Sequence, residues 1–400
     1  MRSFRDPLHG FIHADQLETA LINSGPVQRL RFVHQLGFAF LVFPGAEHSR
    51  FSHVLGTMHL AGRVYDLLAA KHPELLQSGV DSRQRRLVRS AALLHDIGHA
   101  PFSHSAEDLF SEPIDHEQMT QKLLGSEEIT DIFRRFGDGI AAEDVQRVLA
   151  GSLDPLERLL SRIVAGELDV DKMDYLLRDS LYCGVRYGSF DLDRLLETIE
   201  AVEDPDTGGW GIGVEEGGVH ALEALVMARY YMFTQVYFNV IGKALELHFH
   251  RWLSADRRRR WPTQTEQFLL HDDISTLSRM RGSDHPHATA IIERSQFPLV
   301  WQSEEHLDGV SAQQLRSLST SWQQQYGADR VLVSYASKDP HRLEEQPIWV
   351  RLPNGEFQSM REASHFIRHL ERIDRVRVYA DNSIHRQVKT KVEHDLKTLL

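Results

Sequence analysis

The sequence predicts a mainly α-helical protein with a smaller α+β lobe at its C-terminal end. From residue 15 to residue 252, apolar residues recur at helical spacing and β-branched runs are few. Beyond residue 253 the pattern changes to short apolar runs, which are typical of strands. Of the 400 residues, 42% are hydrophobic, which is enough to bury a large core.

Turn-forming residues divide the helical part into segments. Ser82 suits the N-cap of a helix that Gly98 ends, and Pro101 supports a break just beyond it. The Gly-rich passage Asp204–Gly218 is typical of a hairpin. We expect helices over Ser52–His72, Ser82–Ile97, Asp115–Leu124, Ala142–Leu149, Pro155–Ala165, Asp171–Ser180, Leu192–Glu200 and Gly218–Leu253.

The change in pattern after Leu253 sets a predicted boundary between residues 1–253 and residues 254–400. The second segment opens on a basic run, Arg257–Arg260, which we interpret as a solvated helix end or linker rather than a nucleic-acid contact. Its expected elements are strands over Arg330–Tyr335, Ile348–Leu352 and Val376–Tyr379 and a helix over Met360–Glu371.

Composition excludes several classes of protein. The net charge of −12 argues against a surface built as a whole for nucleic acid, because phosphate backbones need a basic footprint. The single cysteine, Cys183, excludes an intramolecular disulfide, and we interpret it as a small buried hydrophobe. No stretch approaches the ~20 apolar residues of a membrane helix, and no signal-peptide pattern opens the chain. We therefore expect a cytoplasmic protein that does not enter the membrane.

The 23 histidines make metal or acid–base chemistry worth looking for. His95 and Asp96 stand side by side in the last turn of an apolar helix, where both could reach one ion. An isolated His-Asp pair also arises by chance, so the prediction needs support from neighbouring residues. His99 and His104 follow directly, and the small or turn-forming residues Gly98, Ala100 and Pro101 between them could let a substrate approach the backbone. Suitable ligand types also occur in Arg50–His53, Asp115–Glu117 and Asp169–Lys172, each at the start of an expected helix.

Further polar residues recur at helical spacing. Asp171, Tyr175 and Asp179 share one helix face, and Lys172 beside them could serve a phosphate. The alternative for this face is simple solvation, with Asp171 favoured by the helix dipole.

Two arginines extend the pattern. Arg50 lies three residues before His53, and the arginine fork suits phosphate oxygens. Arg229 and Tyr237 lie eight residues apart in one expected helix. Taken singly, such pairs are more often surface or packing features, so only their joint occurrence is informative.

In this order, the residues resemble the HD-domain superfamily of metal-dependent phosphohydrolases, whose ligand pattern is H…HD…D. They are more similar still to the deoxynucleoside triphosphate triphosphohydrolases that join an HD domain to a sterile-alpha-motif domain in animals, and to their bacterial relatives. The resemblance covers roughly residues 4–250, without a sterile-alpha-motif domain. The matching stretches are Asp6-Pro7-Leu8-His9-Gly10, Gln28-Arg29-Leu30-Arg31, Gln35-Leu36-Gly37, Val42-Phe43-Pro44-Gly45-Ala46, Arg50-Phe51-Ser52-His53, residues 95–104, His116-Glu117 and residues 169–179.

The resemblance implies an HD-domain helical core and a role for each matching residue. The implied metal ligands are His53, His95, Asp96 and Asp171. The implied catalytic residues for proton transfer are His99, Glu107, His116 and Glu117. The implied substrate-binding residues are Arg50, Lys172 and Arg229 for phosphates, His104 near the α-phosphate, Gln35 and Asp179 for the sugar 3′-hydroxyl with Tyr175 beside them, and Tyr237 against the ribose.

The implied reaction is metal-dependent hydrolysis of a deoxynucleoside triphosphate to deoxynucleoside and inorganic triphosphate. Mn²⁺ or Mg²⁺ is favoured, while Fe²⁺ and Zn²⁺ stay open because two His and two Asp suit several metals. His116 is preferred over His99 as the general acid, since Glu117 or Glu107 could hold its charged form.

The resemblance also implies a homodimer or homotetramer with an allosteric nucleotide near Asn23, Gln28 and Arg31. Asn23 replaces an aspartate that reads guanine in the animal enzymes, which argues against activation by a guanine nucleotide. Asn239-Val240 replaces a His-Lys pair, so nucleotide contacts near an oligomer interface are expected to differ.

Two other functions fit the same residues. The first is an HD-type phosphodiesterase or nuclease that acts on cyclic nucleotides or single-stranded DNA, with the same metal site. The second is a non-catalytic nucleotide-binding sensor, which the full set of ligands and acid–base histidines disfavours.

Overall fold

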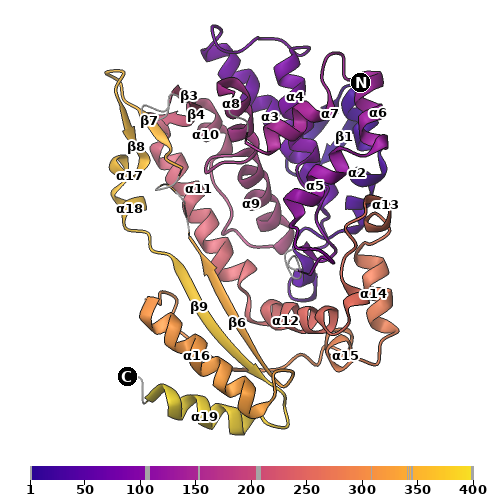
Figure 1. Cartoon of the computed structure of the whole chain (residues 1–400). Helices are drawn as coiled ribbons and strands as arrows, with labels where there is room; N and C mark the ends of the chain where they lie inside the picture. The colour runs from indigo at the N-terminus through magenta and orange to yellow at the C-terminus, as the bar shows by residue number, and fades with distance from the viewer. Residues whose placement is uncertain are drawn as a thin grey trace.

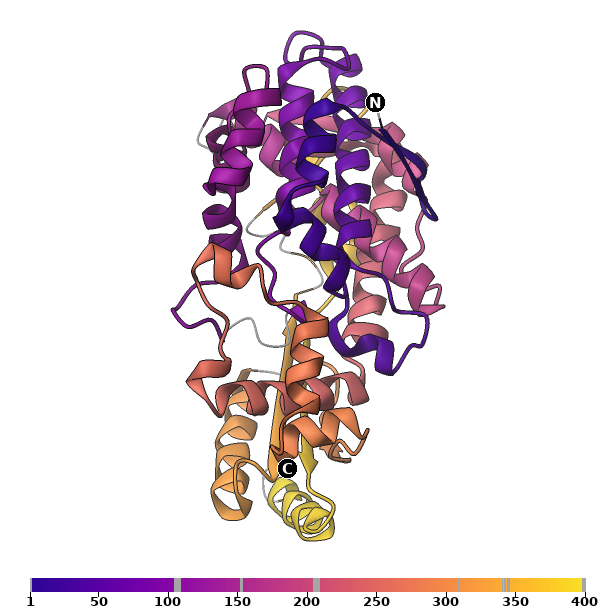
Figure 2. The ribbon, with the colours of Figure 1, turned by 90° about the vertical axis from the view of Figure 1, so that its right-hand side faces the viewer.

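The computed structural model of this protein describes residues 2–103, 109–151, 154–203, 209–307, 309–339, 341, 343 and 346–397. The predicted mainly α fold with a smaller α+β C-terminal lobe is confirmed. Figures 1 and 2 show the N-terminal helical core above and the C-terminal lobe below, with the long strands β6 (Val331–Lys338) and β9 (Ile373–Ala380) of that lobe running upward toward the core.

Helix α3 (Arg50–Lys71) forms the centre of the helical core. It is buried on most sides, as expected of an interior helix that packs against several neighbours. Those neighbours are α4 (Arg83–Leu94), α8 (Pro155–Val164) and α9 (Val170–Cys183). Residues in the first turn of α3 are therefore held inside the protein rather than at its surface.

The remaining core elements surround these helices. The N-terminal hairpin of β1 (Arg2–Asp6) and β2 (Gly10–Ala14), which the sequence analysis did not predict, packs on α3. Ser82 precedes α4 without a side-chain cap, and α4 ends before His95. The other helices here are α1 (Gln16–Ile22), α2 (Gly25–Arg29), α5 (His116–Leu124), α6 (Glu127–Phe136), α7 (Ala142–Leu149) and α10 (Leu192–Thr198).

The prediction of a single helix over Gly218–Leu253 is wrong. The structure has α11 (Val219–Met232), a π-helical turn over Phe233–Tyr237, and α12 (Val240–Ser254). Asn239 caps α12, because its side chain accepts hydrogen bonds from the backbone N–H groups of Ile241 (2.9 Å) and Gly242 (3.2 Å). The cap starts a new helix where the apolar periodicity alone suggested a continuous one.

The predicted hairpin near residues 204–218 forms from β3 (Ile199–Glu203) and β4 (Trp210–Glu215). β7 (Trp349–Arg351) adds in parallel to β4, and β8 (Phe357–Ser359) follows. The chain after residue 253 thus supplies strands to a sheet begun before it, and the domain boundary at that position stays a prediction.

The predicted helix Met360–Glu371 is divided into α17 (Met360–Ala363) and α18 (His365–Arg368). The Ser364 side chain lies between them and caps α18.

The C-terminal lobe is a three-stranded antiparallel sheet, in the order β5 (Leu299–Gln302), β9, β6. Helices α16 (Gly309–Tyr326) and α19 (His385–Lys397) pack against this sheet, and α12 also packs against β6. Helices α13 (Thr265–Phe268), α14 (Asp273–Arg281) and α15 (Pro286–Ile292) link the lobe to the core. None of the helices in the described ranges has the length and apolar character needed to cross a bilayer.

A buried ion pair fastens α1 to α4. Arg89 donates to Glu18 through Nη2 (2.9 Å) and Nε, and the same guanidinium donates to the carbonyl oxygens of His13 (2.8 Å) and Met58 (3.3 Å). Glu18 and Arg89 are both buried, so neither charge has water as a substitute partner.

Replacing one member of this pair should destabilise the fold. We expect Glu18→Gln to lower the free energy of unfolding by about 3–5 kcal/mol, because Arg89 keeps a buried charge without its counterion. Urea unfolding measures the difference. The control is Glu197→Gln, whose exposed pair with Arg194 spans 3.6 Å and should contribute less than about 1 kcal/mol. Equal losses in the two variants would contradict the assignment.

Candidate metal centre

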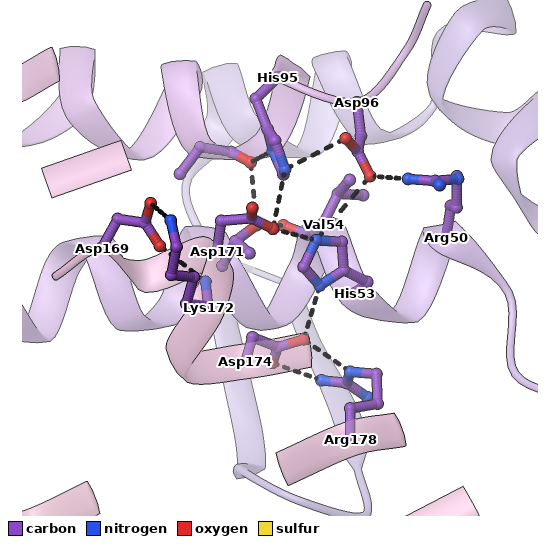
Figure 3. A network of polar contacts seen from close by, with 12 residues as sticks. Arg50, His53, Val54, His95, Asp96, Asp169, Asp171, Lys172, Asp174 and Arg178 are labelled. Carbon is purple, nitrogen blue, oxygen red and sulfur yellow. Dashed lines mark hydrogen bonds and ion pairs between the residues drawn. The ribbon is translucent and has the colours of Figure 1, made fainter. Parts of the chain in front are cut away.

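Three predicted metal ligands from distant parts of the chain meet at one point (Figure 3). His53 lies in the first turn of α3, His95 directly after α4, and Asp171 in the first turn of α9. One ligand atom from each lies within 4.8 Å of the others. His53 Nε2 is 3.0 Å and His95 Nε2 is 3.6 Å from Asp171 Oδ1. Two imidazoles and a carboxylate therefore face the same small volume.

Asp96, the fourth predicted ligand, lies beside this group of three. Its Oδ1 is 3.3 Å from His95 Nε2, and its Oδ2 is 3.8 Å from His53 Nε2. Arg50 Nη1 donates to the same Oδ2, so the carboxylate is shared between the cluster and a cation. The ligand roles of all four residues stay predictions.

The hydrogen bonds of His95 suit a metal. Its Nδ1 lies 2.8 Å from the carbonyl oxygen of Ala92, which can only accept, so Nδ1 carries the hydrogen and Nε2 is left with a lone pair. Among the described residues, that buried Nε2 has no hydrogen-bond partner. A neutral imidazole presented in this way, next to carboxylates, fits a divalent cation.

The hydrogen bond between His53 and Asp171 shifts the pKa of both side chains toward their charged forms. Burial alone lowers the pKa of His53, but hydrogen bonds with Asp171 and Asp174 raise it to about 10. Burial raises the pKa of Asp171, but the hydrogen bond with His53 and the His95 ring, whose Nε2 lies 3.6 Å from Asp171 Oδ1, bring it below its ordinary value. The pair thus holds a proton between nitrogen and oxygen at neutral pH, in a position that a divalent cation would take over.

His53 is held by two residues that were not among the predicted site residues, Asp174 and Arg178. His53 Nδ1 lies 2.8 Å from Asp174 Oδ2, and Arg178 donates to both oxygens of Asp174 through Nε (2.8 Å) and Nη2 (2.9 Å). Burial raises the pKa of Asp174, but Arg178 and the histidines hold it well below its ordinary value. The signal in the sequence was an acid and a base four residues apart on α9, which by itself is typical of a solvated helix face.

The predicted acid–base histidines lie together beside the cluster. The rings of His99 and His116 have centroids 4.1 Å apart, and His99 Nδ1 is 3.2 Å from Asp96 Oδ1. Burial and the nearby Arg50 charge hold the pKa of His99 well below its ordinary value. Glu117 is exposed at the start of α5.

His104 and Glu107 lie outside the described residues.

The three predicted phosphate-binding side chains each face an acid in this structure. Arg50 contacts Asp96 and donates to Ser103 Oγ (3.0 Å). Lys172 Nζ lies 2.7 Å from Asp169, and Arg229 Nη1 lies 3.3 Å from Glu167. Their roles toward phosphate stay predictions.

The predicted sugar-binding residues gather at the other end of α9. Asp179 accepts from the Tyr237 hydroxyl (2.8 Å) and lies 2.8 Å from His48 Nε2. Tyr237 packs edge-on to Tyr175 at 6.3 Å between centroids. The backbone N–H of Gln35 donates to the His48 carbonyl (3.0 Å), and the buried Gln35 Oε1 accepts no hydrogen bond from the described residues. His48, which was not among the predicted site residues, also belongs to this group.

The predicted activator residues lie near the surface, around α2. Arg31 donates to Gln28 Oε1 (2.9 Å) and stacks over the Phe51 ring at 3.5 Å, while Asn23 accepts from Arg2 (3.1 Å). A nucleotide at this place, like the homodimer or homotetramer, stays a prediction.

Loss of a ligand should strongly weaken metal binding. We expect Asp171→Asn and His95→Ala each to weaken Co²⁺ affinity by at least about 100-fold, because removing a ligand should cost no less than disturbing its support. A Co²⁺ titration of the metal-free protein, followed by visible absorbance, measures the change. His13→Ala removes an exposed histidine whose side chain lies 2.9 Å from Ser3 Oγ in the N-terminal hairpin, and it should bind Co²⁺ as the unmodified protein does. Unchanged affinity in Asp171→Asn and His95→Ala would exclude the site.

Two protein-family models together match most of this chain. The HD domain model matches residues 50–179, and the HD associated region model matches residues 190–398. YwfO of Bacillus subtilis is 39% identical over 246 residues, covering 61% of this chain and 53% of YwfO. The deoxynucleoside triphosphate triphosphohydrolase SAMHD1 homolog of Dictyostelium discoideum is 34% identical over 277 residues, covering 67% of this chain and 50% of that protein.

A solved structure extends the similarity to nearly the whole chain. The crystal structure of a hypothetical protein from Aquifex aeolicus has a TM-score of 0.83 and 31% identity, and the match covers 98% of this chain and 99% of that one. The chain spans only about half the length of YwfO and of the Dictyostelium protein. The HD domain match begins at Arg50 and ends at Asp179, and so contains the three-residue cluster. The chain belongs to the HD-domain family.

Proposed function

We propose that this protein is a metal-dependent phosphohydrolase that converts a deoxynucleoside triphosphate to deoxynucleoside and inorganic triphosphate. The observation that carries the proposal is the arrangement along α9. Asp171 at its start belongs to the metal cluster, and Asp179, two turns later and about 12 Å along the axis, belongs to the group around Tyr237. The name of the Dictyostelium relative, a deoxynucleoside triphosphate triphosphohydrolase, supports the same substrate class.

The proposed metal ligands are His53, His95 and Asp171, with Asp96 as the fourth. Mn²⁺ and Mg²⁺ are the favoured ions. A bound divalent cation supplies a Lewis acid that lowers the pKa of water and offsets the charge that grows on phosphate. Solvent reaches this cluster through Asp171, whose side chain is 34% accessible.

Side chains of the protein would stabilise the charge on phosphate and supply the proton for the leaving group. Arg50 can exchange its contact with Asp96 for a phosphate oxygen, which adds charge stabilisation in the transition state. A protonated His116 or His99 would donate to the 5′-oxygen of the leaving deoxynucleoside. We favour His116, because burial and Arg50 disfavour the charged form of His99.

Sugar selection would fall to the group at the end of α9. The carboxylate of Asp179 and Gln35 Oε1, which accepts no hydrogen bond within the described part of the chain, would be acceptors for a 3′-hydroxyl. The Tyr237 ring, held by Asp179, would pack against the ribose and disfavour a 2′-hydroxyl.

The decisive experiment follows the products. The purified protein, incubated with each deoxynucleoside triphosphate and Mn²⁺ or Mg²⁺, should release inorganic triphosphate, and His95→Ala should reduce the rate by at least about 100-fold because it loses the Lewis acid. Release of pyrophosphate or phosphate, or cleavage only of cyclic nucleotides or single-stranded DNA, would contradict the proposal. Nucleotide binding without turnover would indicate a sensor.

A further inference from the structure

We infer that Asp174 is a positioning residue, which together with His9 and Arg178 fixes the orientation and tautomer of His53. Metal affinity would then depend on side chains that never touch the cation. This inference rests on the proposed metal centre and goes beyond it, because none of these three residues belongs to the proposed ligand set.

The contacts of Asp174 fix the direction of each hydrogen bond. A guanidinium can only donate, and Arg178 donates to Asp174 Oδ2 from Nε (2.8 Å) and to Oδ1 from Nη2 (2.9 Å). Asp174 is therefore the acceptor in the whole group. His9 Nε2 lies 2.7 Å from Oδ1, and His53 Nδ1 lies 2.8 Å from Oδ2.

The consequence reaches the cluster directly. Because Asp174 keeps a hydrogen on His53 Nδ1, Nε2 is the nitrogen that would give up its proton and offer a lone pair when a cation takes the place beside Asp171. Histidine ligands of metals usually have such a carboxylate or carbonyl partner on their second nitrogen. The Ala92 carbonyl keeps the hydrogen of His95 on Nδ1 in the same way, so both imidazoles direct Nε2 toward the proposed cation.

Gly56, one turn after His53 on α3, leaves the space in which the Asp174 carboxylate contacts His53. A Cβ at Gly56 would lie 1.9 Å from Asp174 Oδ1 and 2.5 Å from Arg178 Nη2. Any larger residue must push the Asp174–Arg178 pair away from α3. The same helix therefore supplies a ligand and the space for the partner of that ligand.

The N-terminal hairpin completes the arrangement. Asp6 at the end of β1 lies 2.8 Å from Arg178 Nη1 through its Oδ2, and its Oδ1 accepts the backbone N–H groups of Leu8 (2.9 Å) and His9 (3.0 Å). His9 also lines a cavity of about 380 Å³ together with His59. This space next to His9 should allow substitutions there without rearranging the core.

A purely structural role for the network makes a different prediction. If Asp174, Arg178 and Asp6 only fasten α9 to the hairpin, disturbing them lowers stability but leaves the affinity of the folded protein for metal unchanged. Metal affinity and the melting temperature without metal therefore have to be measured on the same samples.

The test uses two glycines of α3 in the full chain. Gly56→Ala displaces the Asp174 carboxylate without removing any ligand or charge. Gly62→Ala is the matched control, because its Cβ would lie 2.6 Å from Arg89 Nη1, a guanidinium of the buried pair with Glu18 that does not contact the cluster. We expect Gly56→Ala to weaken Co²⁺ affinity by about 10–100-fold and to change the visible spectrum of the bound ion. Gly62→Ala should bind Co²⁺ as the unmodified protein does, even if its melting temperature falls equally.

A second pair of variants covers a failure of Gly56→Ala to fold. His9→Leu removes the donor to Asp174 Oδ1, whereas His9→Gln keeps an N–H at that position, so His9→Leu should lose about tenfold in Co²⁺ affinity and His9→Gln should recover most of it. Affinities and spectra that match the unmodified protein in His9→Leu and in folded Gly56→Ala would overturn the positioning role. If the unmodified protein itself binds no Co²⁺, the metal centre is refuted, and the positioning role is refuted with it.

Discussion

The close packing of α3 against α9 is the constraint on which the rest of the site depends. It brings His53 within hydrogen-bonding distance of two carboxylates from α9, Asp171 on one side of the ring and Asp174 on the other. The contact is close enough that Gly56 has no room for a side chain. A small change in the distance between these helices would move the ligand, its partner and the cluster together.

The site is assembled from charges that are already balanced. Asp171 is neutralised by histidines, Asp174 by Arg178, and Asp96 by Arg50. Such pairing removes much of the cost of burying ionised groups. In the proposed function, the cation would replace the contacts of Asp171 and Asp96 with His53 and Arg50, and the phosphate would then pair with Arg50. Few charges would be left without a counterion when both ligands are bound.

The C-terminal half of the chain contributes Tyr237 to the group around Asp179. Tyr237 ends the π-helical turn and donates to Asp179, and Phe238, directly after the turn, packs on β6 and β9. The strands β7 and β8 extend the sheet of β3 and β4. The region that matches the HD associated model is therefore continuous with the HD domain in its packing.

The sequence by itself determined the mainly α fold, the hairpin after Leu192–Thr198 and the residue types that could hold a metal, because helical period, glycine placement and ligand chemistry are local properties. It did not determine the break at Asn239, where a side-chain cap overrides apolar spacing. Nor could it assign Asp174, His48 or His9. An acid on a helix or a histidine in a loop looks the same whether it is solvated or buried, and the partners of these residues lie up to 165 residues away. Only the tertiary structure decided which of the many acids and histidines would share one buried volume.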